Sequence, residues 1–475
     1  MTSTGTHLTE LSAGELLAGY AADTFRPVDV LAAVQTRIAE QESQLNAFAL
    51  QEPVAATHAA AASAARWAAG EPVGDLDGVP ITLKENIATA GAPITAGTAA
   101  LADAEPRTVD GLVALTTAAA GAVRLGKTTM PDYGMLSSGL SSLHGITRNP
   151  WNHGWSPGGS SAGAAAAAAA GFGPLHVGSD IGGSIRLPAG WTGLASLKPT
   201  HGLVPVDPPY LGRVVGPLAR TVADLAVAMR VLVHPDPLDR DHTYIPLPVG
   251  DWTQVSANPM HDGELAGLRV AVHTDAGAGL RTDDEVARIV ADAAAVFARA
   301  GAQVVALPPF VTHELLGQLE MFLRARSWLD VLALTQRRRD AVLPYIRRWA
   351  IRAADLSGTQ VFEAYTAVQE LRARTATATG PYDVVLSPVA PVATFPAEQH
   401  GPTDDPDTAF HHVAYTAPYN VSDQPAATVN AGFTADGRPV GLQLAGRRFT
   451  DVALLRVAGW FEGARSESAR PVWPS

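Results

Sequence analysis

The chain contains no cysteine among its 475 residues. This absence excludes disulfide bonds, a thiol nucleophile and thiolate metal ligands. Lysine is scarce as well, since the 34 basic residues include only Lys84, Lys127 and Lys198. Arginine, which stays protonated in proteins, is therefore the ordinary cation of this chain, whereas a lysine can supply a neutral amine. The few lysines thus become candidates for a role that needs a proton acceptor.

Long basic runs and long apolar runs are also missing. The formal net charge is −12 and no basic run could follow a phosphate backbone, so we expect no nucleic-acid partner. Residues 1–17 lack the basic region and the apolar stretch of a signal peptide, and the alanine-rich run at 163–170 is too short to span a membrane. With 47% hydrophobic and 17% charged residues, we expect a large, soluble, cytoplasmic protein without a membrane partner.

Helical and strand-like segments alternate along the chain. Residues 8–70 show helical spacing, 79–83 form a short apolar strand, and 268–308 read as a strand, a helix and a strand. Residues 312–378 read as further helices, and 428–446 as a β-hairpin. No linker-like break separates these segments, so we expect a single α/β domain with a helical insertion.

Three other segments carry specific expectations. The second helix of the N-terminal part is predicted to run from 27 to 48. Residues 215–220 read as an exposed turn before a helix that continues through 233. Residues 235–265 are rich in proline, aspartate and histidine, which favours an excursion over the surface.

The stretch from 149 to 199 carries the most chemistry. It holds two glycine-rich turns, GGSSAG at 158–163 and DIGGS at 180–184, joined in part by the alanine run, which predicts a thin, buried helix. Each turn has a serine directly after a pair of glycines, where the backbone can bend sharply and its N–H groups can face a ligand. Glycine- and serine-rich segments are often linkers, but the apolar surroundings favour buried structure here. Hydroxyl groups beside backbone donors indicate acyl-transfer chemistry.

A serine nucleophile needs a base, and the histidines do not offer one. The GxSxG nucleophile elbow and the HExxH metal motif are both absent, and the 14 histidines are scattered. Lys84 stands at the end of the apolar strand 79–83. Because burial disfavours the charged form of an amine, the pKa of such a lysine can fall by several units. Lys84 is therefore the expected base, and no metal is expected.

One motif is misleading. Residues 121–128, GAVRLGKT, match the phosphate-binding pattern GxxxxGK[ST]. That motif needs a strand before its loop and a helix after it, whereas this copy follows a helix and is itself strand-like. We therefore do not predict a nucleotide site there.

Several segments together resemble one family. They are GVPITLKENI around Lys84, GKTTMPDYG at 126–134, SPGGSSAG at 156–163, GSDIGGSIRLPAG at 178–190 and GPLARTVADLA at 216–226. In this order, and over about residues 10 to 465, the sequence resembles the amidase signature family of serine hydrolases. The resemblance implies a central, twisted, mixed β-sheet covered by helices on both faces. It also implies four parts of this one domain: N-terminal helices at 8–70, a catalytic core at 76–233, a variable helical insertion at 312–378 and the C-terminal part of the core at 382–465.

The resemblance also implies site residues. Ser184 would be the nucleophile, Ser160 the bridging serine after a cis peptide bond, and Lys84 the base. The backbone N–H groups of Ile181, Gly182, Gly183 and Ser184 would form the oxyanion hole. Asp180 and Arg186 would support the site. The loop of Gly134, Met135, Leu136 and Ser137 would line the acyl pocket. No cofactor is implied, and the state expected is a monomer or a homodimer.

The substrate expected from this resemblance is a small-molecule amide. The mostly apolar loop at 134–137 and the aromatic residues of the insertion favour an apolar or aryl amide, an anilide, a carbamate or an ω-amino-acid oligoamide. One alternative is the glutaminase subunit of a tRNA-dependent amidotransferase, which would bind glutamine through charged groups. A catalytically silent relative that acts as a binding module is a further alternative, although Lys84, Ser160 and Ser184 are all present.

Overall fold

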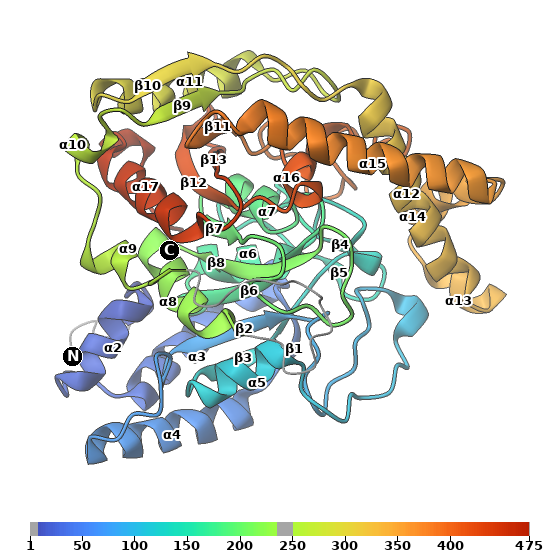
Figure 1. The fold of residues 1–475 in the computed structure, drawn as a ribbon. Coiled ribbons are helices and arrows are strands. Elements are labelled where there is room, and N and C mark those ends of the chain that lie inside the picture. Colours follow the sequence, from blue (N-terminus) through green and yellow to red (C-terminus); the bar gives the residue numbers. More distant parts are fainter. Residues whose placement is uncertain (1–7, 235–249, 475) are drawn as a thin grey trace.

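The computed structural model describes residues 8–234 and 250–474, and a long mixed sheet crosses the molecule (Figure 1). The sheet has 11 strands in the order β1-β3-β2-β6-β8-β7-β12-β13-β11-β9-β10. Parallel pairing joins β3, β2 and β6 at one end and β11, β9 and β10 at the other, while the pairs between them are antiparallel. The bounds of its strands are β1 (Phe48–Gln51), β2 (Pro80–Lys84), β3 (Val123–Thr128), β6 (Leu175–Asp180), β7 (Ala195–Lys198), β8 (Val214–Ala219), β9 (Arg269–Val272), β10 (Gln303–Ala306), β11 (Val384–Pro388), β12 (Ala426–Phe433) and β13 (Pro439–Ala445). A separate two-stranded sheet pairs β4 (Leu140–Ser141) with β5 (Gly145–Ile146).

Helices cover both faces of the sheet, as expected for this α/β fold (Figure 1). Strand residues alternate between the faces, so that in β8 Leu218 packs against α6 and α7 while Ala219 belongs to the core shared with α8, α11 and α17. The helices are α2 (Ala13–Ala21), α3 (Pro27–Leu45), α4 (Pro53–Ala69), α5 (Leu112–Ala119), α6 (Ala162–Ala170), α7 (Arg186–Thr192), α8 (Val222–Leu232), α9 (Gln254–Ala257), α10 (Asp262–Leu265), α11 (Asp284–Arg299), α12 (His313–Leu332), α13 (Gln336–Ala341), α14 (Pro344–Ala350), α15 (Gly358–Thr379), α16 (Ala417–Val421) and α17 (Asp451–Ala464).

The alanine-rich run forms α6, and every one of its nine residues is buried. Its small side chains let the helix lie close to the strands beside it. At Gly163 an added Cβ would come within 2.1 Å of the carbonyl oxygen of Ala47, so this position has no room for a side chain. The prediction of a thin, internal helix is confirmed.

The segment predicted as a helical insertion forms α12 to α15 (Figure 1). These helices share a hydrophobic cluster with α7, which includes Leu187 and Trp191 of α7, Leu319 of α12 and Trp349 of α14. The insertion therefore belongs to the same hydrophobic cluster as the helix that follows the second glycine-rich turn. This packing brings side chains of α12 within reach of that turn.

Three sequence-based expectations were wrong in part. The helix predicted to reach residue 48 ends at Leu45, because Asn46 adopts a left-handed conformation with φ of 52°, and β1 follows it. The exposed turn predicted at 215–220 is largely the buried strand β8, whose burial on both faces removes the polar alternation of a surface strand. Of the predicted surface excursion, 235–249 lies outside the described residues, while Trp252 and Leu265 in the remainder join the main hydrophobic core.

The phosphate-loop pattern at 121–128 coincides with β3, in agreement with its interpretation as a false motif. Lys127 is 1% exposed, and its Nζ donates to the carbonyl oxygen of Pro93 at 3.4 Å. Gly126 lies so close to the neighbouring strand that a Cβ would approach the Leu50 carbonyl oxygen to 2.1 Å. Within residues 8–234 and 250–474, no helix has the length and apolar character that crossing a membrane requires.

Candidate active site

Lys84 lies at the carboxyl end of β2 and is completely buried. Its Nζ atom is 2.8 Å from Ser160 Oγ, 3.1 Å from Ser161 Oγ and 3.5 Å from the carbonyl oxygen of Ser179. A neutral amine has one lone pair and two N–H groups. It can therefore accept a hydrogen bond from the Ser160 hydroxyl while it donates to the other two oxygens.

The surroundings of Lys84 favour this neutral form. Burial, with a smaller contribution from the guanidinium of Arg213, lowers its pKa from 10.5 to about 7 against the opposing influence of Asp180 and Glu85. The two other lysines are also buried, and burial lowers the pKa of Lys127 to about 8 and that of Lys198 to about 7. A low pKa therefore does not distinguish Lys84; its contact with Ser160 does.

The first glycine-rich turn holds Ser160 against Lys84. The Gly159–Ser160 peptide bond is cis, and Gly159 is so enclosed that a Cβ would come within 2.5 Å of the Ser138 carbonyl oxygen. Ser161 is the N-cap residue of α6, and its backbone N–H donates to the carbonyl oxygen of Ser184 at 3.2 Å. This bond joins the two glycine-rich turns, which are separated by about twenty residues in the sequence.

The second turn presents backbone donors next to Ser184. Among the described residues, the N–H groups of Ile181, Gly182 and Ser184 donate to no acceptor. The N–H group of Gly183 instead donates to the carboxylate of Asp180 at 2.7 Å. Of the four donors expected in an oxyanion hole, three are therefore available to a ligand, and the fourth holds the turn in place.

A buried ion pair supports this turn from behind. Both Asp180 and Arg186 are buried, and Arg186 Nε and Nη2 each lie 3.0 Å from a carboxylate oxygen of Asp180. Burial alone would raise the pKa of Asp180, but Arg186 and the amide of Asn420 hold it below its usual range. Arg186 also donates to Gln443 Oε1 at 2.7 Å, and Thr416 Oγ1 donates to the Gly182 carbonyl oxygen at 2.6 Å. The C-terminal part of the chain thus braces the turn.

We expect Arg186→Met to lower the free energy of unfolding by about 3–5 kcal/mol, because it leaves the Asp180 carboxylate buried without its cation. Urea denaturation followed by circular dichroism measures this change. The double variant Asp180→Asn/Arg186→Met carries no uncompensated charge and should be less destabilised than the two single variants combined. Additive losses would contradict the coupling of these residues.

The two glycine-rich turns open into a cavity of about 240 Å³. Ser160, Ser179, Asp180, Ile181 and Ser184 line it, and so do Gly134 and Met135 of the expected acyl-pocket loop. The other two loop residues are not brought to its wall: Leu136 packs in the hydrophobic cluster with α7, and Ser137 is partly exposed. Six polar or aromatic wall residues were not predicted from the sequence: Asn86, Tyr133, Asp207, Arg213, Arg326 and Asp330.

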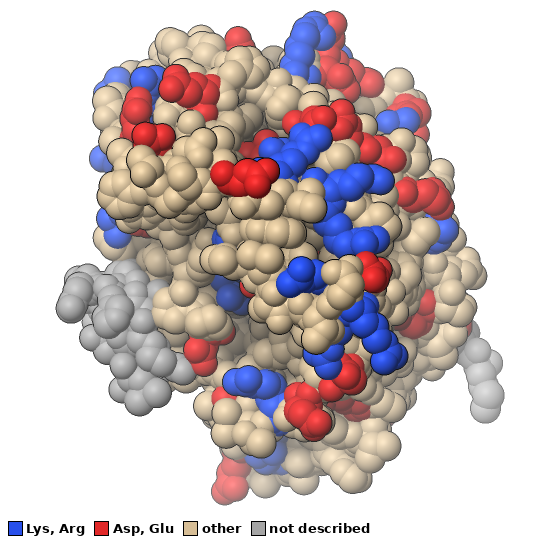
Figure 2. Space-filling view, turned by 90° about the vertical axis from the view of Figure 1, so that its right-hand side faces the viewer, with Lys and Arg blue, Asp and Glu red and all other residues tan. Residues whose placement is uncertain are grey.

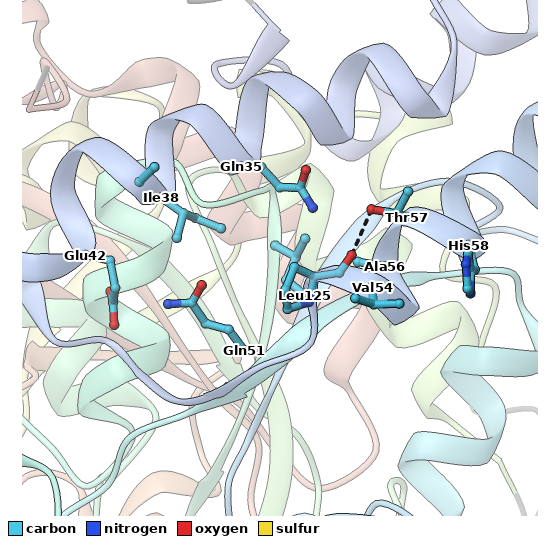
Figure 3. Close-up of a pocket in the computed structure, with 11 residues that line it drawn as sticks. Gln35, Ile38, Glu42, Gln51, Val54, Ala56, Thr57, His58 and Leu125 are labelled. Carbon is cyan, nitrogen blue, oxygen red and sulfur yellow. Dashed lines mark hydrogen bonds between the residues drawn. The ribbon is translucent and has the colours of Figure 1, made fainter.

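A larger cavity, of about 630 Å³, lies between α3, α4 and β3 and shares no wall residue with the first (Figure 3). Its wall carries polar side chains, but the Glu42 carboxylate is already occupied by the N–H groups of Ala47 and Phe48 at 3.0 and 2.8 Å. Thr57 Oγ1 is likewise occupied, since it donates to the Pro53 carbonyl oxygen at 2.8 Å. The smaller cavity therefore has the stronger chemical features of a catalytic site.

Among residues 8–234 and 250–474, no histidine lines the smaller cavity. Burial lowers the pKa of His176 and His412 to about 4 and 3, so that both are neutral. In the part of the chain that the structure describes, no three His, Cys, Asp or Glu side chains form a group that could hold a metal ion. Lys84 is a titratable residue whose side chain contacts a serine of this cavity, Ser160.

Comparisons with known proteins identify the family of this chain. The Amidase family model matches residues 29–455. An acylamidase of Rhodococcus erythropolis is 35% identical over 96% of this chain and 95% of its own length, and a subunit of the glutamyl-tRNA(Gln) amidotransferase of Salinispora tropica is 35% identical over 96% and 98%. The crystal structure of a bacterial aryl acylamidase of the amidase signature family superimposes with a TM-score of 0.85 at 27% identity, over 96% of both chains. The chain therefore belongs to the amidase signature family and is a hydrolase that acts on carbon–nitrogen bonds of amides.

Proposed function

We propose that this amidase works through a covalent acyl-enzyme on Ser184, with Ser160 as the bridging serine and Lys84 as the base. The observation that carries the proposal is the 2.8 Å contact between a fully buried Lys84 Nζ and Ser160 Oγ. An amine with a pKa of about 7 is neutral in half of the molecules at that pH and can accept a proton.

The reaction then follows in two stages. Neutral Lys84 takes the proton of the Ser160 hydroxyl while Ser160 takes that of Ser184, whose Oγ bonds to the amide carbonyl carbon. The N–H groups of Ile181, Gly182 and Ser184 stabilise the negative oxygen that forms. The carbon–nitrogen bond breaks as the proton returns through Ser160 to the leaving nitrogen. Water repeats the relay, releases the acid and restores Ser184.

The substrate class we propose is an apolar or aryl amide, an anilide, a carbamate or an ω-amino-acid oligoamide. Apolar side chains of Ile94, Met130, Met135 and Ile181 on the cavity wall support this proposal. The relatives named acylamidase and aryl acylamidase support it as well. An apolar wall favours substrates that bury hydrocarbon surface.

A second candidate is glutaminase activity, as in the glutaminase subunit of a tRNA-dependent amidotransferase. Two observations favour it: relatives named as one subunit of a glutamyl-tRNA(Gln) amidotransferase reach 35% identity, and the cavity carries charged side chains in addition to its apolar ones. The mostly apolar loop at 134–137 argues against a glutaminase. Arg213, Arg326, Asp207 and Asp330 on the cavity wall weaken that argument.

We expect the isolated chain to release aniline from an apolar anilide with a kcat/KM at least about tenfold above that for glutamine, because glutamine leaves the apolar wall unfilled. A panel of anilides, aliphatic amides, carbamates and glutamine, with product analysis, measures this preference. Faster ammonia release from glutamine than from any other amide would favour the second candidate.

A further inference from the structure

Two arginines from distant parts of the chain face the cavity that holds Ser160 and Ser184. Arg213 precedes β8, and Arg326 lies in α12. Both are only partly exposed. Neither guanidinium donates a hydrogen bond to a residue within 8–234 or 250–474, and no carboxylate oxygen there lies within 4.0 Å of either one. Five N–H donors per guanidinium are thus left for a ligand or solvent.

Several other arginines of the helical insertion are paired with carboxylates. They are Arg324 with Glu320 at 2.7 Å, Arg338 with Asp103 at 2.8 Å and Arg347 with Asp340 at 3.3 Å. Figure 2, which views the molecule from the side of α12 to α15, shows a band of basic side chains with acidic ones among them. Arg326 points to the cavity instead and lies over the ring of Tyr210, 4.6 Å from its centroid. This stacking fixes the guanidinium but leaves the N–H groups at its edge free.

The cavity is an unfavourable place for unpaired cations. Burial lowers the pKa of Arg213, and the second guanidinium, Arg326, lowers it further against the opposing influence of Asp207, which indicates that the two cations lie near each other. Asp330 also lines the cavity, but burial raises its pKa in spite of Arg326, so this carboxylate is itself poorly compensated. Removing a charged group from water without a partner is costly, and an arriving anion would supply the missing partner.

We propose that Arg213 and Arg326 bind a carboxylate of the amide substrate. This inference rests on the proposed amidase function of Ser184. The site takes an amide with an apolar body against Met130 and Met135 and a carboxylate at the end that meets the two guanidiniums. A guanidinium can hold a carboxylate through two parallel N–H···O bonds, which fixes direction as well as affinity.

Two matched pairs of anilides test this proposal. The monoanilide of glutaric acid is compared with the anilide of pentanoic acid, and 4-acetamidobenzoate with 4-methylacetanilide, so that the carboxylate is placed on the acyl side or on the leaving side. We expect one carboxylate substrate to exceed its neutral partner in kcat/KM by about tenfold or more. Arg213→Gln and Arg326→Gln should each lower the ratio of kcat/KM between the carboxylate substrate and its neutral partner by about tenfold. Arg213→Lys should lower this ratio less, because lysine keeps the positive charge but lacks the two parallel N–H donors of a guanidinium.

Controls separate this proposal from the chemistry. Arg337→Gln removes an exposed arginine of α13 that does not line the cavity and should leave the ratio as it is. Isothermal titration calorimetry of both pairs with the Ser184→Ala variant measures affinity without turnover. The anilide that carries the carboxylate should again bind more tightly than its neutral partner. The proposal is overturned if the neutral partner is preferred in both pairs, or if Arg213→Gln changes both partners by the same factor. A different observation would contradict the proposed function itself: no aniline release that depends on Ser184.

Discussion

Ser184→Ala is expected to lower kcat/KM for an anilide by roughly 10⁴- to 10⁶-fold while the protein stays folded. The substitution removes the hydroxyl that we propose attacks the carbonyl carbon but leaves the backbone N–H of residue 184, so the proposed oxyanion donors remain. Ser184 is 9% exposed and lines the cavity, so the lost atom leaves space that water can fill. Steady-state kinetics on one anilide measures the loss, and circular dichroism verifies the fold.

Detection of the acyl-enzyme tests the same assignment independently of the kinetics. Mass spectrometry of wild-type protein treated with a slowly released carbamate or ester should place an acyl group on the peptide that contains Ser184, and the alanine variant should carry none. Ser256→Ala, which alters an exposed serine of α9, is the matched control and should retain activity. An adduct on another residue, or turnover within about tenfold of wild type, contradicts the assignment.

Much of the fold could be predicted because local patterns and tertiary structure agree. The alanine run is both a good helix former and small enough to pack next to the sheet, and the hairpin of β12 and β13 is signalled by Asp436 and Gly437. The wrong predictions concern segments whose structure depends on distant partners. Strand β1 is defined by its pairing with β3, and β8 by its position between β6 and β7, and neither partner is visible in the local sequence.

The candidate site divides in the same way. Lys84, Ser160 and Ser184 stand in distinctive local motifs, and the structure brings Lys84 and Ser160 into contact and places both serines on one cavity wall. Arg213 and Arg326 have no such motif. Each is an ordinary arginine beside a strand or within a helix, and only the packing of α12 over the glycine-rich turns brings them together. A polar residue at the start of a buried strand is the one sequence signal that could have indicated Arg213.

The scarcity of lysine gave a partial indication of the proposed base. All three lysines are buried with lowered pKa values, although the contacts of only one of them include a cavity serine. Lys198 Nζ instead donates to the carbonyl oxygen of Pro199 at 2.9 Å. Composition could therefore indicate that an amine would be held neutral, but not which amine would accept a proton.

The pH dependence of activity tests that distinction. Lys84 accepts a proton only when it is neutral, and its pKa is lowered to about 7, so kcat/KM should rise with pH through about 7 and then level off. Lys84→Arg keeps a cation of similar reach that does not lose its proton, and it should lower kcat/KM by roughly 10²- to 10⁴-fold, as should Lys84→Met. If Lys84 were only a positive anchor for the glycine-rich turns, the arginine variant would remain active and the methionine variant would not.

Lys198 provides the matched control, because burial lowers its pKa to about 7 as well and it does not contact the cavity serines. Lys198→Met should leave the midpoint of the pH profile near 7, whatever it does to stability, since the amine that titrates in the relay is still present. The profile is measured as kcat/KM against pH on one anilide for wild type and the three variants. Loss of the alkaline rise in Lys198→Met, or substantial turnover by Lys84→Arg, would mean that the proton leaves Ser184 by another route. In the arrangement proposed, that route begins with the 2.8 Å contact between Lys84 Nζ and Ser160 Oγ, and an arginine at position 84 cannot accept the proton there.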